Sequence, residues 1–296
     1  MRILLTGKNG QVGFELQRAL APLGTVIAVE RSECDLESET SLRNAIRGAE
    51  PDIIVNPAAY TAVDRAESEV ARAHAINAVA PGIIGTEAAR RGALVVHYST
   101  DYVFDGAASG WYDEQDAPNP QGVYGESKLA GEKSLAASGA RHLIFRTSWV
   151  FGVHGANFAK TMLRLAAERD ELKIVADQIG APTSAALIAD VTAHAIRKIQ
   201  SDRNGSPDGI YHLAAGGETS WHAYARHIIE TARRAGLPIR VAADAILPIA
   251  TAEYPTPACR PANSRLNTAK LQKTFGLILP HWQRGLDHVL QQITRG

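Results

Sequence analysis

Two side chains able to transfer a proton stand four residues apart, at Tyr124 and Lys128. On a helix this spacing places both on one face, about 6 Å apart along the axis. A free phenol has a pKa of about 10, and a nearby ammonium stabilises the phenolate and makes the phenol a useful acid at neutral pH. The pair is therefore predicted to give a proton to a carbonyl oxygen, with Lys128 also able to hydrogen-bond the ribose of a nicotinamide cofactor.

Spacing alone also fits an ordinary pair on a helix surface, and the preceding strand favours chemistry. The apolar run from Val95 ends in hydroxyl side chains and continues into Thr100 and Asp101. Ligands of open α/β sheets bind beyond the carboxyl ends of the strands. We expect Thr100 to donate a hydrogen bond to the substrate carbonyl beside Tyr124. Asp101 either reaches a substrate hydroxyl or caps the turn.

A glycine loop follows the first apolar run of the chain. Glycines recur every third residue, and a helical pattern begins directly after them. Strand, glycine turn and helix together are typical of a dinucleotide site, where backbone N–H groups approach a pyrophosphate at the positive end of the helix. The residues predicted to hold the cofactor here are Gly7, Gly10, Gln11, Val12 and Gly13.

The end of the second predicted strand carries two neighbouring residues of opposite charge. Glu30 stands roughly 20 residues past the loop and could accept hydrogen bonds from the adenosine ribose, which favours NAD. Arg31 could instead neutralise a ribose 2′-phosphate, which favours NADP. The cofactor is therefore predicted to be NADPH or NADH. Position along the chain adds these residues to the cofactor site: Asp35, Leu36, Ala58, Ala59, Tyr60, Thr61 and Tyr98.

Short apolar strands alternate with helical segments through the first half of the chain. Because the strands are almost continuously apolar, helices should cover both sheet faces, which predicts a doubly wound parallel α/β sheet of Rossmann type. We expect this dinucleotide-binding domain over residues 1–150. Residues 151–296 should form mainly a smaller α/β substrate-binding region, interleaved with the first because a strand near 209–214 and a helix near 220–235 return to it. A loop is predicted from Asp202 to Gly209.

Composition excludes several classes of function. Lys plus Arg and Asp plus Glu each number 31, so no excess positive charge points to nucleic acid. No segment approaches the roughly 20 apolar residues that span a bilayer. Two cysteines, Cys34 and Cys259, are too few for a disulfide framework. These features predict a cytoplasmic protein with a small-molecule partner.

The chain resembles the extended short-chain dehydrogenase/reductase family over nearly its whole length, and within it the reductases of nucleotide-linked keto sugars. Three of the supporting stretches mark the superfamily: Gly7 to Gly13, Ser99 to Phe104 and Tyr124 to Lys128. Three others are more selective for these reductases: Phe145 to Phe151, Asp177 to Thr183 and Arg260 to Leu266.

The resemblance implies NAD(P)H-dependent reduction of the C4 keto group of dTDP-4-dehydro-6-deoxy-L-mannose to dTDP-L-rhamnose, for cell-surface polysaccharides such as lipopolysaccharide O-antigen. It implies that Thr100, Tyr124 and Lys128 are catalytic. Trp149 is implied to pack against the sugar, where an indole face suits a deoxysugar. Arg260 and Asn263 are implied to face the diphosphate of this dTDP-linked 4-keto-6-deoxyhexose.

The resemblance also bears on assembly. Family members can form homodimers through carboxylate-bound magnesium, and Glu15 resembles one ligand. Ala186 stands where a second carboxylate is expected, and hard divalent ions need oxygen ligands, so we predict no metal.

Two other functions share the fold. One is the regulatory subunit of a methionine adenosyltransferase, which binds a dinucleotide without catalysing reduction, and the other is a nucleotide-sugar epimerase. Intact Thr100, Tyr124 and Lys128 argue against the first, and the stretches around Gln178 and Arg260 favour a reductase over the second.

Overall fold

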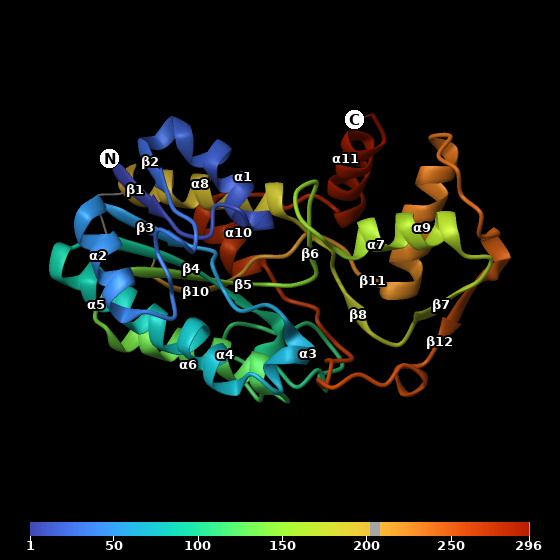
Figure 1. Cartoon of the computed structure of the whole chain (residues 1–296), viewed down its shortest axis with the longest axis horizontal. Helices are drawn as coiled ribbons and strands as arrows, with labels where there is room; N and C mark the ends of the chain where they lie inside the picture. Colours follow the sequence, from blue (N-terminus) through green and yellow to red (C-terminus); the bar gives the residue numbers. More distant parts are fainter. Residues whose placement is uncertain (202–207, 296) are drawn as a thin grey trace.

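A parallel six-stranded sheet forms the centre of the molecule (Figure 1). The computed structural model describes residues 1–201 and 208–295, so most of the predicted loop from Asp202 lies outside the described residues. The strand order is β10-β5-β4-β3-β1-β2. The strands are β1 (Arg2–Leu5), β2 (Thr25–Ala28), β3 (Ile53–Asn56), β4 (Leu94–Thr100), β5 (His142–Thr147) and β10 (Gly209–His212).

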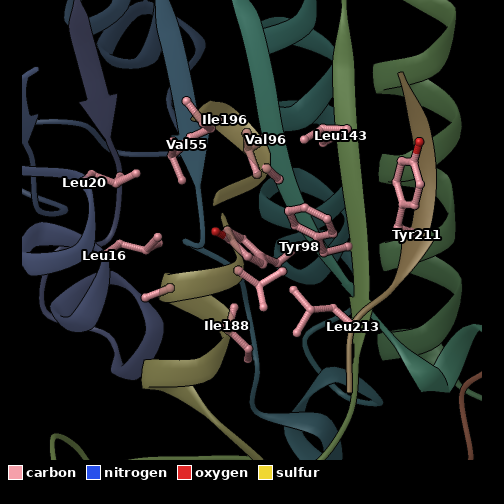
Figure 2. Close-up of a cluster of buried hydrophobic side chains, with 14 of the residues drawn as sticks. Leu16, Leu20, Val55, Val96, Tyr98, Leu143, Ile188, Ile196, Tyr211 and Leu213 are labelled. Atoms are coloured by element: carbon pink, nitrogen blue, oxygen red, sulfur yellow. The ribbon is translucent and has the colours of Figure 1, made fainter. Parts of the chain in front are cut away.

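Helices cover both faces of the sheet, as continuous burial of β3 and β4 requires. On one face lie α1 (Gln11–Leu20), α8 (Ala185–Ser201) and α10 (Ala269–Phe275). On the other lie α2 (Glu39–Ala49), α5 (Ala80–Arg91) and α6 (Val123–Ala137). In Figure 2, Leu16 and Leu20 of α1 and Ile188 and Ile196 of α8 pack over Val55 and Val96 of the sheet. The predicted doubly wound α/β fold is confirmed.

The helical stretch predicted from Glu69 to Gly92 is divided. It comprises α4 (Val70–His74), a π-helical turn (Ala75–Val79) and α5, with α3 (Val63–Ala66) before it. Asn77, in the π turn, accepts a hydrogen bond from Tyr60 N and donates to Tyr60 O and Ser127 Oγ. Such local insertions recur at functional sites, and this one ties the chain after β3 to α6.

A second unit with its own core lies beside the carboxyl edge of the sheet (Figure 1). It contains α7 (Phe158–Glu168), α9 (Trp221–Arg234), α11 (Trp282–Arg295) and the parallel pair β7 (Leu172–Val175) and β12 (Ile246–Ile249). Two short ladders are separate from the central sheet. They pair β6 (Val150–Phe151) with β9 (Thr183–Ser184), and β8 (Ile179–Gly180) with β11 (Thr219–Ser220). Single turns of helix lie at Ala21–Leu23, Asp101–Val103, Ala243–Ala245 and Thr251–Glu253.

The helix expected near 220–235 does not return to the central sheet. Its apolar stripe, which includes Tyr224, Ile228 and Ile229, packs in the core of the second unit with α7 and β7. Both faces of the central sheet are already covered, one by α1, α8 and α10 and the other by α2, α5 and α6. Strand β10, by contrast, lies in the central sheet beside β5.

A buried ion pair joins α6 to β5. Arg146 donates to both carboxylate oxygens of Glu132, at 2.9 Å from Nε and 2.7 Å from Nη2, and their side chains are 2% and 3% exposed. The guanidinium also lies over the Phe104 ring. At this burial each charge depends on the other for compensation.

We expect Glu132→Leu to lower the free energy of unfolding by about 3–5 kcal/mol, because it leaves the Arg146 guanidinium buried without a counter-charge. Adding Arg146→Met should recover much of that loss. The matched control is Glu168→Leu, which breaks an exposed pair with Arg164 and should change stability by less than about 1 kcal/mol. Urea unfolding measures all three; equal effects of Glu132→Leu and Glu168→Leu would contradict the expectation.

Candidate active site

A cavity of about 920 Å³ opens at the carboxyl ends of the strands, between the sheet and the second unit. Its walls come from the glycine loop, the loops after β2, β3, β4 and β5, the start of α6, and the second unit. Of the cofactor residues predicted from the sequence, those that line it are Gly7, Gly10, Gln11, Val12, Gly13, Arg31, Asp35, Leu36, Ala58, Ala59, Tyr60, Thr61, Tyr98, Tyr124 and Lys128.

The glycine loop has no room for side chains at two positions. Gly7 adopts a φ of +61°, and a Cβ on it would lie 2.9 Å from the Cβ of Ala58. A Cβ on Gly13 would lie 2.1 Å from the Gly7 carbonyl oxygen. Helix α1 begins at Gln11, directly after Gly10. Among the described residues, no side chain forms a capping hydrogen bond with its N-terminus. The cradle therefore fits the pyrophosphate of a dinucleotide, which its free N–H groups can bind.

Glu30 is the one predicted cofactor residue that does not line the cavity. Its carboxylate accepts hydrogen bonds from Asn9 Nδ2 at 2.5 Å and Ser32 Oγ at 3.0 Å. These nearby donors hold the carboxylate in the turn, and its contact with the ribose stays a prediction. Its neighbour Arg31 does line the cavity, beside Asp35.

Tyr124 lies at the start of α6, as the spacing predicts, but its pKa is raised to about 12. Burial is the main cause, a hydrogen bond with Thr100 opposes it, and the charge of Asp101 adds to it. The expected lowering of this pKa by Lys128 is not found. The phenol therefore keeps its proton throughout the physiological range and can act as an acid.

Lys128 is 2% exposed, and its pKa is lowered to about 8 by burial, which Glu132 partly offsets. Its Nζ donates a hydrogen bond to the carbonyl oxygen of Tyr98 at 2.5 Å. The ammonium is thus anchored to β4, one helical turn from Tyr124, where both line the cavity.

A buried polar chain that the sequence analysis did not identify lies behind Lys128. Nε2 of His97 lies 3.3 Å from Lys128 Nζ, and Nδ1 lies 3.2 Å from Asn56 Nδ2. Thr6 donates to Asn56 Oδ1 at 2.6 Å. Burial, followed by the charge of Lys128, lowers the pKa of His97 well below its usual value, so the imidazole is neutral beside the ammonium.

Thr100 and Asp101 lie at the end of β4 and line the cavity. Thr100 Oγ1 donates to Asp101 Oδ1 at 3.0 Å and accepts from Tyr102 N at 3.3 Å. Burial raises the pKa of Asp101 to about 6. Thr100 therefore caps this turn, and Asp101 lines the cavity although it is buried. Thr100 must turn its hydrogen away from Asp101 to donate to a substrate.

A pair of stacked tryptophans forms the wall on the side of the second unit. The rings of Trp149 and Trp221 are 3.7 Å apart between centroids and inclined by 15°. Trp149 has a φ of +48°, and its indole packs against Gly180, where a Cβ would lie 2.7 Å away. Trp221 Nε1 donates to Gln178 Oε1 at 3.1 Å. The sequence analysis missed Trp221 because only tertiary packing brings it to Trp149.

The two C-terminal predictions differ in outcome. Arg260 lines the cavity, and its Nη2 donates to Asp64 Oδ2 at 2.9 Å. Asn263 does not line it: its Nδ2 donates to the carbonyl oxygens of Ala108 and Gly110 at 2.8 and 2.7 Å. Asn263 is 5% exposed and ties the C-terminal segment to a loop, and its contact with a diphosphate stays a prediction.

Glu15 forms an ion pair with Arg18 of the same helix. Arg18 donates to Glu15 Oε2 at 3.3 Å and to Asp190 Oδ1 at 3.0 Å. Within residues 1–201 and 208–295, no three His, Cys, Asp or Glu side chains gather as a metal site would require. The same residues include no helix long and apolar enough to cross a membrane.

A doubly wound sheet, a glycine cradle and a Tyr-Lys pair on one cavity define a dinucleotide-dependent reductase of the short-chain dehydrogenase/reductase class. The family model described as "RmlD substrate binding domain" matches residues 1–295. The chain is 53% identical over 299 residues to dTDP-4-dehydrorhamnose reductase of Escherichia coli K12, covering 99% of this chain and 98% of that protein. The chain belongs to this family of reductases.

Solved structures agree. A dTDP-4-dehydrorhamnose reductase from Clostridium acetobutylicum superimposes with a TM-score of 0.90 at 36% identity, covering 99% of each chain. The dTDP-4-dehydrorhamnose reductase of Bacillus anthracis, in complex with NADP, superimposes with a TM-score of 0.87 at 35% identity, covering 98% of this chain and 99% of that one.

Gly13→Ala should weaken NADPH binding at least ~10-fold, because the added methyl group would push the Gly7 carbonyl into the cradle. Gly48→Ala is the control, because a Cβ added at this exposed position on α2 would meet no atom within 4 Å. It should leave binding unchanged. Titration by tryptophan fluorescence measures both, and unchanged affinity in Gly13→Ala would show that the loop does not hold the pyrophosphate.

Proposed function

We propose that this protein uses NADPH or NADH to reduce the C4 keto group of dTDP-4-dehydro-6-deoxy-L-mannose, giving dTDP-L-rhamnose for cell-surface polysaccharide synthesis. The observation that carries the proposal is the protonated phenol of Tyr124 beside Lys128 and Thr100, on the same cavity as the glycine cradle. Relatives at 50 to 53% identity named dTDP-4-dehydrorhamnose reductase support the substrate.

The chain's residues supply the proton and its electrostatic support. The bound nicotinamide supplies the hydride. Tyr124 gives its proton to the carbonyl oxygen as negative charge develops there. The ammonium of Lys128 stabilises the phenolate that remains. Thr100, released from Asp101, donates a second hydrogen bond to the same oxygen.

The cofactor occupies the cavity from the loop after β2 to β4. We assign to it the predicted residues that line the cavity, from Gly7 to Lys128. The backbone of the Gly7 to Gly13 loop binds the pyrophosphate, and Lys128 binds the nicotinamide ribose. In this proposal residues 1–150 form the cofactor-binding domain, with β10 added, and residues 151–296 mainly bind the sugar nucleotide.

The sugar nucleotide occupies the side of the cavity formed by the second unit. One face of Trp149 is covered by Trp221, so the free surface of the pair offers a rigid apolar wall to the deoxysugar. Arg260 binds the diphosphate in competition with Asp64. Asp101 accepts a hydrogen bond from a sugar hydroxyl.

The alternatives lack comparable support. A regulatory subunit of methionine adenosyltransferase type has no use for an intact Thr100, Tyr124 and Lys128 set. An epimerase of the same fold would use it, but the relatives at high identity are reductases.

Location and assembly are part of the proposal. Free Cys34 and Cys259 suit the reducing cytoplasm, where sugar nucleotides and reduced nicotinamide cofactors meet. A homodimer would need a contact other than a magnesium bridge, because Arg18 already donates hydrogen bonds to Glu15 and Asp190 and Ala186 supplies no oxygen ligand.

The purified protein should oxidise NADPH or NADH only when the dTDP-linked 4-keto sugar is present.

Tyr124→Phe should reduce turnover roughly 10²- to 10⁴-fold with little change in NADPH affinity, because it removes only the general acid. Tyr254→Phe, at a tyrosine that is 57% exposed and away from the cavity, is the control with unchanged turnover. Absence of turnover in the unmodified protein with either cofactor would disprove the proposed reaction.

Catalysis should weaken as pH rises through about 8, the pKa of Lys128. The ammonium predominates below this pH and is lost above it, so the phenolate loses its stabilising charge and kcat/KM should fall about tenfold per further pH unit. Lys128→Met should have low activity and no such alkaline limb. A flat profile of kcat/KM up to roughly pH 10 would show that this ammonium is not required.

A further inference from the structure

The amino group of Lys128 has two hydrogen-bond partners among the described residues. Nζ donates to the carbonyl oxygen of Tyr98 at 2.5 Å and lies 3.3 Å from Nε2 of His97. An ammonium carries three N–H donors and no acceptor. With the third N–H left for the cavity, which Lys128 lines, both buried donors have a partner if Nε2 of His97 accepts.

The position of the proton on the His97 ring determines whether Nε2 can accept. A neutral imidazole has one N–H and one acceptor nitrogen, so Nε2 accepts when the proton is on Nδ1. His97 is neutral, because burial and the charge of Lys128 lower its pKa well below the usual value, against a hydrogen bond with the Asn56 backbone. The ammonium form of Lys128 therefore requires the Nδ1–H tautomer of His97.

Asn56 faces that ring nitrogen. Its side-chain Nδ2 lies 3.2 Å from Nδ1 of His97, and its Oδ1 accepts a hydrogen bond from Thr6 Oγ1 at 2.6 Å. Since the amide nitrogen is a donor, this orientation leaves the imidazole proton on Nε2, opposite an uncharged amine. Turning the amide over gives Nδ1–H an acceptor, and the Thr6 hydroxyl can then accept from Nδ2, because a hydroxyl both donates and accepts.

Three neighbouring strands hold these polar side chains. Thr6 follows β1, Asn56 ends β3, and His97 of β4 is paired with Asn56 in the strand register. All three residues are buried, at 1% exposure each. The ring proton, the amide and the hydroxyl can therefore change direction together while the residues that carry them keep their positions.

The charged groups around Lys128 can be named. Burial lowers the pKa of Lys128, and Glu132, one turn along α6, raises it; Glu132 also pairs with Arg146 of β5. Asp101, at the end of β4, adds charge near the phenol. Strand β3 and the π turn carry no charged side chain. Of the described side chains on β3 and β4, His97 is the one within hydrogen-bond distance of Nζ.

We propose that His97 is a positioning residue that keeps Lys128 as an ammonium by accepting one of its protons, and that Asn56 determines which nitrogen of the His97 ring can accept. The inference rests on the proposed function, in which this ammonium stabilises the Tyr124 phenolate. Without the acceptor, a buried N–H of the ammonium is unpaired, which favours the uncharged amine.

The first test measures kcat/KM against pH. His97→Leu should lower the midpoint of the alkaline limb by about one pH unit or more, because the ammonium loses an acceptor. His97→Gln, whose side-chain oxygen can accept, should restore much of that shift. Asn56→Asp places an acceptor and a negative charge beside Nδ1 and should raise the midpoint by about one pH unit. The matched control is His212→Leu, at a buried histidine of β10 that does not line the cavity, and its midpoint should not move.

The second test needs no substrate. Multiple-bond ¹H–¹⁵N correlation spectra of the full-length protein distinguish the two imidazole tautomers. Comparison with His97→Gln identifies the His97 ring among the 10 histidines. At a pH below the alkaline limb, His97 should be the Nδ1–H tautomer.

Each outcome decides the proposal. Opposite shifts of the limb in His97→Leu and Asn56→Asp, together with the Nδ1–H tautomer, support it. A limb that moves in the same direction in both variants, or that does not move in His97→Leu, overturns it, because a merely structural role would not give shifts of opposite sign. An Nε2–H tautomer below the limb also overturns it. The spectra do not depend on turnover, so failure of the proposed reaction is detected separately, by the assay of the unmodified protein.

Discussion

The site depends on the close approach of α6 to the chain segments beside it. A Cβ on Gly125 would lie 2.2 Å from the Tyr102 carbonyl oxygen, and a Cβ on Gly131 would lie 2.0 Å from that of Asn77. Neither contact tolerates a side chain, so glycine at both positions lets the helix sit against the turn after β4 and the π turn together. This proximity buries Lys128 deeply enough for Nζ to reach the Tyr98 carbonyl.

Burying that ammonium has electrostatic consequences that extend through the helix. Glu132, one turn beyond Lys128, raises the lysine pKa and so offsets part of the effect of burial. The same carboxylate forms the bidentate pair with Arg146 of β5. Lys128, Glu132 and Arg146 thus form a line of alternating charge from the cavity into the protein. On the other side, neutral His97 can neighbour the ammonium without adding charge.

Local signals in the sequence were sufficient for the fold and for the centre of the site. Apolar runs predict the strands, and the positions of Gly13, Tyr124 and Lys128 relative to strand ends and helical turns predict one cavity. Two residues that the sequence analysis did not identify, Trp221 and His97, belong to no motif and lie beside the other site residues only through packing. The strand-end position of Glu30 and the motif around Asn263 likewise did not reveal the hydrogen-bond partners that each side chain has in the structure.

In the proposed function, proton transfer and sugar recognition use the same cavity but different helices and strands. The path of the chain explains this separation. After β5 the backbone leaves the sheet, turns at Trp149, and returns to the sheet at β10, the neighbour of β5. The excursion therefore begins and ends at adjacent strands, and α8 within it packs on α1 behind the glycine loop. Trp149 follows β5 and Trp221 follows β10, so two adjacent strands of the sheet position the stacked pair. Under the proposed function, substitutions in the second unit can therefore alter the sugar that is accepted while α6 and β4, which position Tyr124 and Thr100, remain unchanged.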